Sequence, residues 1–277
     1  MRATRRARRA ARPLFEGVAL QAAQTQSMPP TIRANGVTPN DGTTNTIQPG
    51  EWISIYGTNL AGGAFEWSGN FPTSLGGVQV EINGRPAYLT YVSPTQINAQ
   101  APDDDTTGAV SVTVTTSAGT ATSSATLAPY APAFSLIDGR HVAAIILRNG
   151  SGAYGDGSYD ILGPTGDCFG YFTAAANPGD TLAIFAVGLG PTDPAVAAGA
   201  PYSGAAPITN PLSLYINGVP LVPSFVGLSE AGLYQINVTL PPGLGFGDVP
   251  ILATIGAMST QPNALISLGL GAGIPPA

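Results

Sequence analysis

Histidine and cysteine each occur only once in this chain of 277 residues, which narrows the kinds of catalysis that it could perform. A serine or cysteine nucleophile would need His141 as its base. The Gly-x-Ser-x-Gly sequence of a nucleophile elbow is absent, and no basic residue lies beside Cys168 to activate it. Asp138 and Arg140 indicate that His141 belongs to a polar turn before a strand over residues 142–147. We therefore predict that the protein is not an enzyme.

Carboxylates offer two further kinds of chemistry. Asp156, Asp160 and Asp167 lie in a glycine-rich stretch and could supply the several oxygen ligands that calcium prefers. Their spacing is not that of an EF-hand loop, and the run 103–105 of three aspartates has no metal motif either. A solvated acidic loop is the favoured interpretation, with calcium as the alternative, and no cofactor is predicted. Two carboxylates could also hydrolyse a glycoside, but the sequence does not fix the separation that this reaction needs.

Two large aromatic residues, Phe65 and Trp67, lie in a glycine-rich loop, where they need a reason to be ordered. They could form a platform on which sugar rings stack, or they could fold back over the end of a hydrophobic core. We favour the covering role and keep the pair as the candidate ligand site.

The chain repeats its own skeleton, because segment 49–60 returns as segment 178–189. In each half an Asn-Gly pair and a Gln-Ile-Asn sequence follow, at Asn83-Gly84 and 96–98 and at Asn217-Gly218 and 235–237. Asn-Gly tolerates the positive φ angles of tight hairpins. Because the amides are duplicated in equivalent places, we predict that they are structural and bond to the backbone of neighbouring loops.

Alternating apolar and polar residues indicate strands throughout both halves, for example at 78–82, 110–114 and 236–240. No stretch of similar length has a helical period. The predicted fold is all-β, with two tandem immunoglobulin-like antiparallel β-sandwich domains. The expected division is a leader at 1–29, a first sandwich at 30–129, a second at 130–270 with an inserted loop at about 149–177, and a tail at 271–277.

Charge is distributed unevenly along the chain. Six of the ten arginines lie in the first twelve residues, whereas the chain beyond residue 28 contains 4 arginines and 15 carboxylates. An acidic body should repel nucleic acid and anionic membranes. The arginine-rich start and the short apolar stretch 14–23 are typical of a secretory signal, although Glu16 interrupts that stretch and a disordered basic tail is the alternative. No apolar run is long enough to span a bilayer.

The repeated skeleton also carries a family resemblance. Its ordered motifs are Ile47–Leu60, Leu75–Val78, Ile82–Gly84, Tyr91–Pro94, Gln96–Asn98 and Gly188–Gly190. The series resembles the uncharacterised C-terminal domain of Solibacter-type secreted bacterial proteins, a family similar to the IPT/TIG immunoglobulin-like group. The resemblance covers roughly residues 30–270 and implies a pair of immunoglobulin-like sandwiches on an exported protein. It implies no catalytic or binding residue, and the segment 149–177 departs from the family pattern.

Together these features predict a secreted or cell-surface structural or interaction module. Its loops and sheet edges would hold a partner protein or polysaccharide, and sheet edges could also support self-association. The alternative is a carbohydrate-binding module that uses the loop of Phe65 and Trp67.

Overall fold

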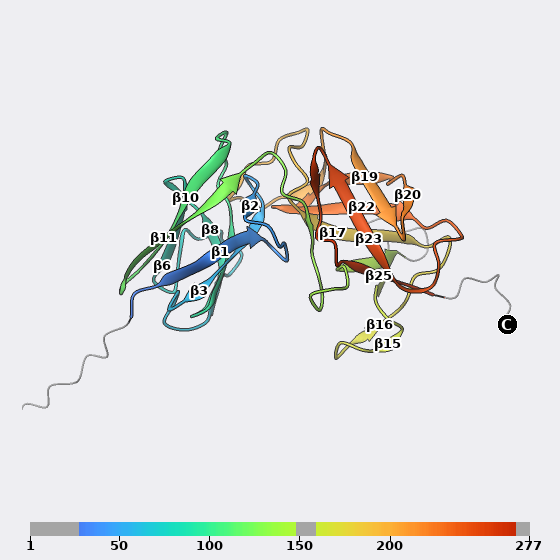
Figure 1. Cartoon of the computed structure of the whole chain (residues 1–277), viewed down its shortest axis with the longest axis horizontal. Helices are drawn as coiled ribbons and strands as arrows, with labels where there is room; N and C mark the ends of the chain where they lie inside the picture. Colours follow the sequence, from blue (N-terminus) through green and yellow to red (C-terminus); the bar gives the residue numbers. More distant parts are fainter. Residues whose placement is uncertain (1–27, 148–158, 270–277) are drawn as a thin grey trace, which may run out of the picture.

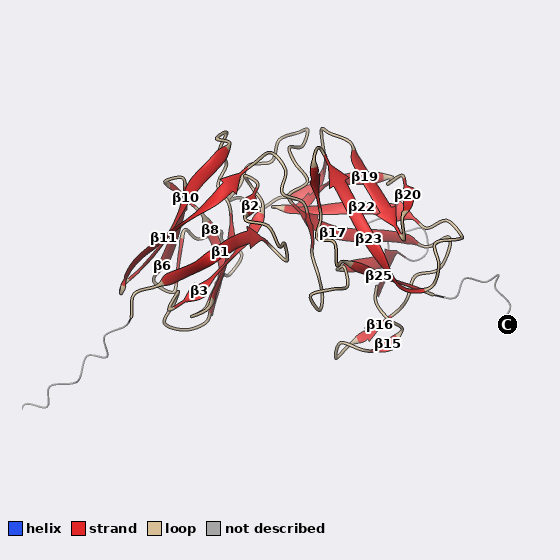
Figure 2. Cartoon of the chain, in the orientation of Figure 1, coloured by secondary structure: helices blue, strands red, loops and turns tan. Residues whose placement is uncertain are grey.

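The computed structural model describes residues 28–147 and 159–269. Nearly all of the predicted leader, the tail and Asp156 therefore lie outside the described residues. Within them the chain forms strands, turns and loops without a helix, as Figure 2 shows, so the expected all-β class is confirmed. It follows that these residues contain no helix long and apolar enough to cross a membrane.

The first half of the chain folds into two sheets. One has the order β1-β3-β9-β8-β4 and consists of β1 (Thr31–Pro39), β3 (Trp52–Thr58), β9 (Gln96–Gln100), β8 (Tyr88–Val92) and β4 (Phe65–Glu66). The other has the order β2-β11-β10-β6-β5 with β7 beside β6, and consists of β2 (Thr46–Ile47), β11 (Gly119–Leu127), β10 (Gly108–Thr116), β6 (Val78–Ile82), β5 (Ser74–Leu75) and β7 (Arg85–Pro86). All pairs are antiparallel except β2 with β11.

The second half repeats this plan with additions. Its larger sheet has the order β14-β13-β17-β22-β21-β18 with β12 beside β17, and consists of β14 (Tyr159–Ile161), β13 (Ala144–Leu147), β17 (Thr181–Val187), β22 (Leu233–Thr239), β21 (Phe225–Glu230), β18 (Ser203–Pro207) and β12 (Ala133–Phe134). Its smaller sheet consists of β20 (Val219–Leu221), β19 (Leu212–Ile216), β23 (Gly247–Ile255), β24 (Met258–Ser259) and β25 (Leu265–Leu268). A hairpin of β15 (Gly166–Asp167) and β16 (Phe172–Thr173) projects from this body (Figure 1).

Each half encloses its own hydrophobic core. One cluster of buried residues runs from Val37 to Leu127 and the other from Phe134 to Leu268. Figure 1 shows the two bodies side by side, with the chain crossing once between them. The alternating residues supply these cores because every second side chain of a strand points to the same face. The chain thus forms two tandem immunoglobulin-like sandwiches.

Both predicted hairpins are present, β6–β7 and β19–β20. Their central residues have positive φ angles, 51° and 73° at Asn83-Gly84 and 49° and 75° at Asn217-Gly218. Positive φ at both central positions is the geometry that a two-residue hairpin requires, and Asn-Gly adopts it with little strain.

Candidate functional site

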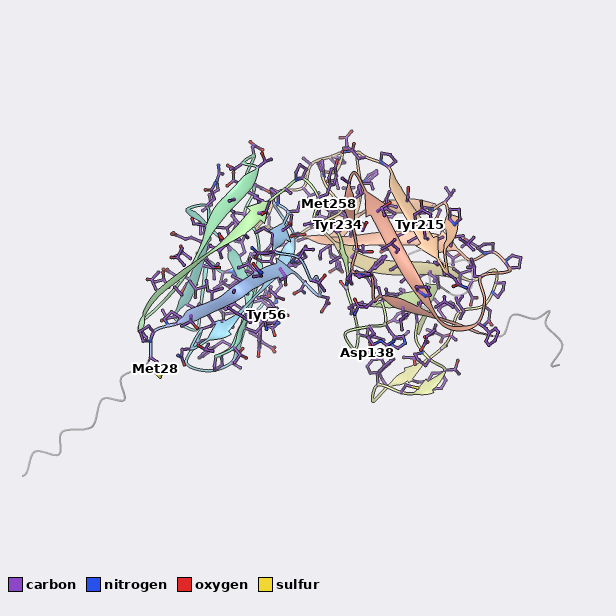
Figure 3. The ribbon with its side chains drawn as sticks, viewed as in Figure 1. Met28, Tyr56, Asp138, Tyr215, Tyr234 and Met258 are labelled. Carbon is purple, nitrogen blue, oxygen red and sulfur yellow. The ribbon has the colours of Figure 1, made fainter. Side chains whose placement is uncertain are left out.

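The turn before β3 joins the two sandwiches through one buried glutamine. The side-chain oxygen of Gln48 accepts a hydrogen bond from Gly190 N at 2.6 Å, and its amide nitrogen donates to the Tyr234 hydroxyl at 3.0 Å. That hydroxyl donates to the Gly190 carbonyl oxygen. Figure 3 shows Tyr234 on the side of the second sandwich that faces the first. Burial raises the pKa of Tyr234, so the hydroxyl stays protonated and able to donate.

A loop of the second sandwich reaches back over the first. Gln100 Oε1 accepts a hydrogen bond from Gly199 N at 2.9 Å, and Asp103 Oδ2 accepts one from Ala198 N at 3.0 Å. Gly199 also lies against the ring of Tyr88, where a Cβ would come within 2.1 Å of the ring. Only glycine permits this approach, so the loop is fixed by two hydrogen bonds and by close packing.

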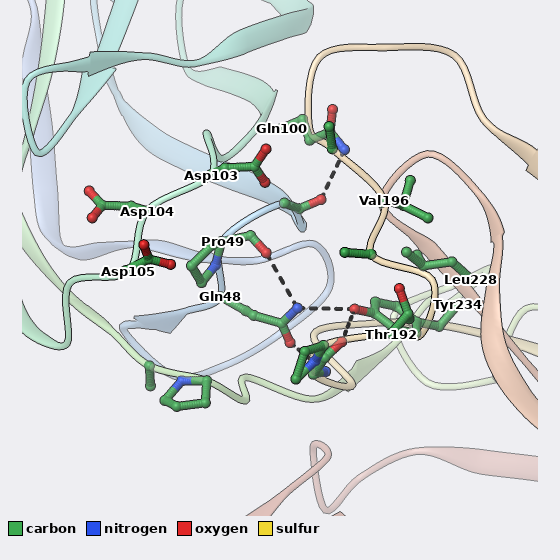
Figure 4. A pocket seen from close by; sticks show the side chains of 18 of the residues that line it. Gln48, Pro49, Gln100, Asp103, Asp104, Asp105, Thr192, Val196, Leu228 and Tyr234 are labelled. Atoms are coloured by element: carbon green, nitrogen blue, oxygen red, sulfur yellow. Dashed lines mark hydrogen bonds between the residues drawn. The ribbon is translucent and has the colours of Figure 1, made fainter. Parts of the chain in front are cut away.

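A cleft of about 460 Å³ lies between this loop and the Gln48 turn (Figure 4). One wall carries the aspartates of the run 103–105, and the rest is largely apolar. Hydrogen bonds from Thr106 and Asn83 lower the pKa of Asp104 to about 2, and Arg85 lies 3.4 Å from the carboxylate. Asp103 thus holds the loop that contains Ala198, and Asp104 holds the loop that contains Thr106. The described residues contain no group of three or more histidines, cysteines or carboxylates that could hold a metal ion.

Glu51 is completely buried at the same junction. Its Oε1 accepts a hydrogen bond from Gln48 N at 2.7 Å, whereas Oε2 has no hydrogen-bond partner among the described residues. Oε2 and the Ala131 carbonyl oxygen both crowd Gly188, where a Cβ would lie 2.4 Å and 2.1 Å from them. Burial raises the pKa of Glu51 well above its ordinary value, and the bond from Gln48 N only opposes this shift. Burial at the junction therefore shifts Glu51 toward its acid form.

Three aromatic side chains meet on the outer side of the first sheet, beside the junction. Trp52 stacks with Phe71 at a centroid distance of 6.2 Å, and Trp67 meets both rings edge-on at 5.8 Å and 4.7 Å. Trp52 Nε1 donates to the Ala231 carbonyl oxygen at 2.7 Å, which ties this cluster to the second sandwich. Phe71 has a φ of 48°, a strained conformation that costs about 1–3 kcal/mol for a bulky residue. The ring contacts must hold it there.

The structure separates the two aromatic residues that the sequence paired. Trp67 belongs to the cluster with Trp52 and Phe71, whereas Phe65 in β4 is 44% exposed and lies against Gly76. Trp67 therefore packs on the outer face of the sheet, beside the junction.

The duplicated amides bond differently from our expectation. Gln96 Nε2 donates to Asn98 Oδ1 at 2.8 Å, and Gln235 Nε2 donates to Asn237 Oδ1 at 2.7 Å. Residues two apart in a strand share one face, so each pair bonds to itself rather than to loop backbone. The same bond in both copies agrees with a structural role, but the predicted partner was wrong.

His141 lies between two carboxylates. Its Nδ1 is 2.7 Å from Asp138 Oδ2 and its Nε2 is 3.2 Å from Asp248 Oδ2. Burial opposes the charged imidazolium, but the contacts with both aspartates outweigh it and raise the pKa of His141. Ser267 Oγ also donates to Asp248 at 2.7 Å. Nδ1 therefore closes the turn at 138–141 on its own Asp138, whereas Nε2 connects the turn to β23 by an ion-pair contact with Asp248 that lacks hydrogen-bond geometry.

The three aspartates of the candidate calcium site are only partly described. Asp160 lies in β14 opposite Ile146, and Asp167 lies in β15. Because Asp156 lies outside the described residues, the geometry of the three together is not defined, and the solvated loop stays the prediction with calcium as its alternative.

Sequence reasoning identified Trp67 but missed Trp52, Phe71 and the Gln48–Tyr234 contact. The sequence did indicate that Trp52 points away from the core, because it alternates along the strand with Ile53 and Ile55, which are buried. No such indication exists for the Gln48–Tyr234 pair, because the two residues are 186 positions apart.

Comparison with known families gives a match over the first sandwich. The family model of the IPT/TIG domain matches residues 34–130. This match supports the IPT/TIG immunoglobulin-like group, and the narrower resemblance to Solibacter-type proteins stays a prediction. No curated protein matches the sequence.

Several solved structures are similar to the chain at low identity. The extracellular region of plexin A4 is 11% identical, with a TM-score of 0.30, over 90% of this chain and 19% of the plexin chain. A protein crystallised with a xylogluco-oligosaccharide is 14% identical, with a TM-score of 0.25, over 83% of this chain and 39% of that one. SGBP-B of Bacteroides uniformis, from a xyloglucan utilization locus, is 14% identical, with a TM-score of 0.25, over 85% and 49%. The chain spans less than half the length of these proteins, and similarity this distant carries no functional argument.

Proposed function

We propose that this protein is an exported, non-enzymatic interaction module that holds a cell-surface protein or polymer. The observation that carries the proposal is the junction, where polar contacts fix one sandwich against the other. Tandem domains usually move relative to each other unless their interface prevents it. Here the interface contains buried hydrogen bonds from Gln48 and a side-chain bond from Trp52.

Separation of the two sandwiches would break these contacts. A buried polar group that loses its partner costs about 1–3 kcal/mol unless water replaces that partner. Gly190 N would lose its acceptor, and the Tyr234 hydroxyl would lose the bond that it accepts from Gln48. A fixed relation between the domains allows one partner to contact loops of both without first ordering them, which lowers the entropic cost of binding.

The one histidine supports a role other than catalysis. Both ring nitrogens of His141 face carboxylates, so the imidazole is committed to holding the turn at 138–141. A general base needs a nitrogen within hydrogen-bond reach of the proton that it removes.

Binding of the labelled full chain to the isolated envelope of its native host tests the proposal. We expect saturable binding that is lost after the envelope is treated with either a protease or glycan-degrading enzymes, according to the partner class. The variant Gln48→Ala should bind several-fold more weakly, because the loosened junction no longer fixes the domains. Gln79→Ala, at an exposed residue of β6 that makes none of the junction contacts described above, is the control.

Two results would contradict this function. One is binding to the envelope that never saturates. The other is a hydrolytic activity of the full chain, in a broad screen, that His141→Ala abolishes.

A further inference from the structure

The outer face of the first sheet carries Trp52 and Gln100, which bond to the second sandwich, and four further side chains that the junction does not use. β3 and β9 are paired so that Trp52 lies opposite Gln100, Ser54 opposite Asn98, and Tyr56 opposite Gln96. These six side chains share one face, because the intervening isoleucines and alanine point into the core. Ser54 and Gln100 are almost completely buried, so the accessible part of this face consists of Tyr56, Gln96, Asn98 and the half-buried ring of Trp52.

The amides on this face are held in a fixed orientation. Asn98 Oδ1 accepts a hydrogen bond from Gln96 Nε2 at 2.8 Å. The single proton of the Ser54 hydroxyl goes to the nearer acceptor, Asn40 Oδ1 at 2.7 Å, and Ser54 Oγ lies 3.1 Å from Asn98 Oδ1. The NH₂ group of Asn98 and the carbonyl oxygen of Gln96 have no hydrogen-bond partner within residues 28–147 and 159–269. Both side chains are half-buried, so these groups are preorganised to bond to a ligand.

Aromatic rings lie at one end of this amide row. Trp52 precedes Ser54 by two residues on the same face, and it packs against Trp67 and Phe71. All three rings are half-buried, and the backbone of Phe71 is held at a φ of 48°. Strain of this kind is concentrated at binding and catalytic sites.

We propose that this face binds a neutral polysaccharide with an extended backbone. A sugar ring offers a C–H face that packs on an aromatic ring and hydroxyl groups that exchange hydrogen bonds with amides. The chain beyond residue 28 has 4 arginines and 15 carboxylates, so its negative field disfavours acidic polysaccharides. The row runs straight along β3 and β9 from the aromatic cluster to Gln96, a path that suits an extended backbone better than a helical one. This inference rests on the proposed function and names the class of its partner.

The second sandwich provides an internal comparison for this proposal. Gln235 and Asn237 form the same amide bond on the equivalent face. Thr181 occupies the position of Trp52 there, so the aromatic cluster is missing from that part of the described chain. The second face should therefore not retain polysaccharide.

Affinity electrophoresis of the full chain tests the inference directly. The probes are hydroxyethylcellulose as the neutral extended chain, soluble starch as the neutral helical chain and polygalacturonate as the acidic chain. We expect retardation by hydroxyethylcellulose alone. Trp67→Ala should raise the dissociation constant at least tenfold, whereas Phe65→Ala, its neighbour outside the cluster, should change it less than twofold. Asn98→Ala should weaken binding several-fold, and the matched Asn237→Ala should not.

Three outcomes would overturn the inference: no retardation by hydroxyethylcellulose, equal retardation by polygalacturonate or starch, or equal effects of Asn98→Ala and Asn237→Ala. If Trp67→Ala does not fold, as judged by its melting curve, the two asparagine variants decide the question. If the chain binds the envelope but hydroxyethylcellulose does not retard it, the polysaccharide site is refuted and the proposed function is not.

Discussion

The turn before β3 and the turn before β17 make the same local hydrogen bond, yet only the first is covered by another domain. Glu51 Oε1 accepts a bond from Gln48 N at 2.7 Å, and Asp180 Oδ2 accepts one from Asn177 N at 2.8 Å. In both copies a Pro-Gly pair lies between the two residues. The repeated turn is thus a self-contained cap that does not depend on its surroundings.

The side chains of the first turn are longer at each position that reaches the second sandwich. Gln48 stands where the second copy has an asparagine, Glu51 where it has an aspartate, and Trp52 where it has a threonine. An extra methylene or a ring allows Gln48 and Trp52 to bond to Gly190 and Ala231. A turn that merely caps a strand in one copy has become the docking surface for the next domain in the other.

Substitution of Trp52 should produce the largest difference between the two copies. Trp52→Ala removes a ring from the aromatic cluster and the hydrogen bond to Ala231, and we expect it to lower the free energy of unfolding by about 3 kcal/mol. Thr181→Ala loses a surface contact to Thr239, and its cost should stay below about 1 kcal/mol. Urea unfolding followed by far-ultraviolet circular dichroism measures both. Equal costs would mean that Trp52 does not anchor the junction.

Removal of the glutamine side chain should have the next largest effect. Gln48→Ala leaves Gly190 N without its acceptor and removes the bond that the Tyr234 hydroxyl accepts, at a cost of about 2 kcal/mol, while that hydroxyl still donates to the Gly190 carbonyl oxygen. Asn177→Ala, the matched change at an exposed site, should cost less than about 0.5 kcal/mol. Both tryptophans lie in the first sandwich, so their fluorescence reports the junction selectively. The comparison fails if the two variants unfold at the same urea concentration.

Local patterns predicted the fold well because they reflect local physics. Alternation placed Val78, Val80 and Ile82 in a buried face, and Asn-Gly fixed two hairpins. Both depend on neighbours along the chain, and the duplication made each visible twice.

The junction could not be predicted in this way, because its contacts join residues that are far apart in sequence. Nothing in the sequence around Gln48 predicts its hydrogen bond to Tyr234. Glu51 is buried only because the second sandwich lies over it. The aromatic cluster shows the same limit. Trp67 was found from its unusual loop, but Phe71 joins it through a backbone conformation that a bulky residue rarely adopts.

The pH dependence of the junction offers a finer test of the two turns. The folded-state pKa of Glu51 is raised, so the stability linked to its acid form is fully present below about pH 4.5 and is lost as pH rises through the folded-state value. Glu51→Gln keeps an acceptor for Gln48 N and should remove this loss, as urea titrations followed by tryptophan fluorescence can show. Asp180→Asn changes a turn outside the junction and should leave the fluorescence-detected slope in place. If Glu51→Gln has the same dependence of stability on pH as the wild type, that dependence belongs to another group.

The clamp around His141 should add a smaller pH effect that belongs to the second sandwich alone. Because the pKa of His141 is raised, its stabilisation is fully present below about pH 6.5 and is lost as pH rises through the folded-state value. Burial opposes ionisation of Asp138 and Asp248, but hydrogen bonds lower the pKa of both, so their contribution is present above about pH 3.8 and is lost as pH falls. The clamp should therefore be strongest between these limits. His141→Gln should flatten the dependence seen by circular dichroism while the tryptophan signal keeps the slope of Glu51, and a change in both signals would show that the sandwiches titrate as one unit.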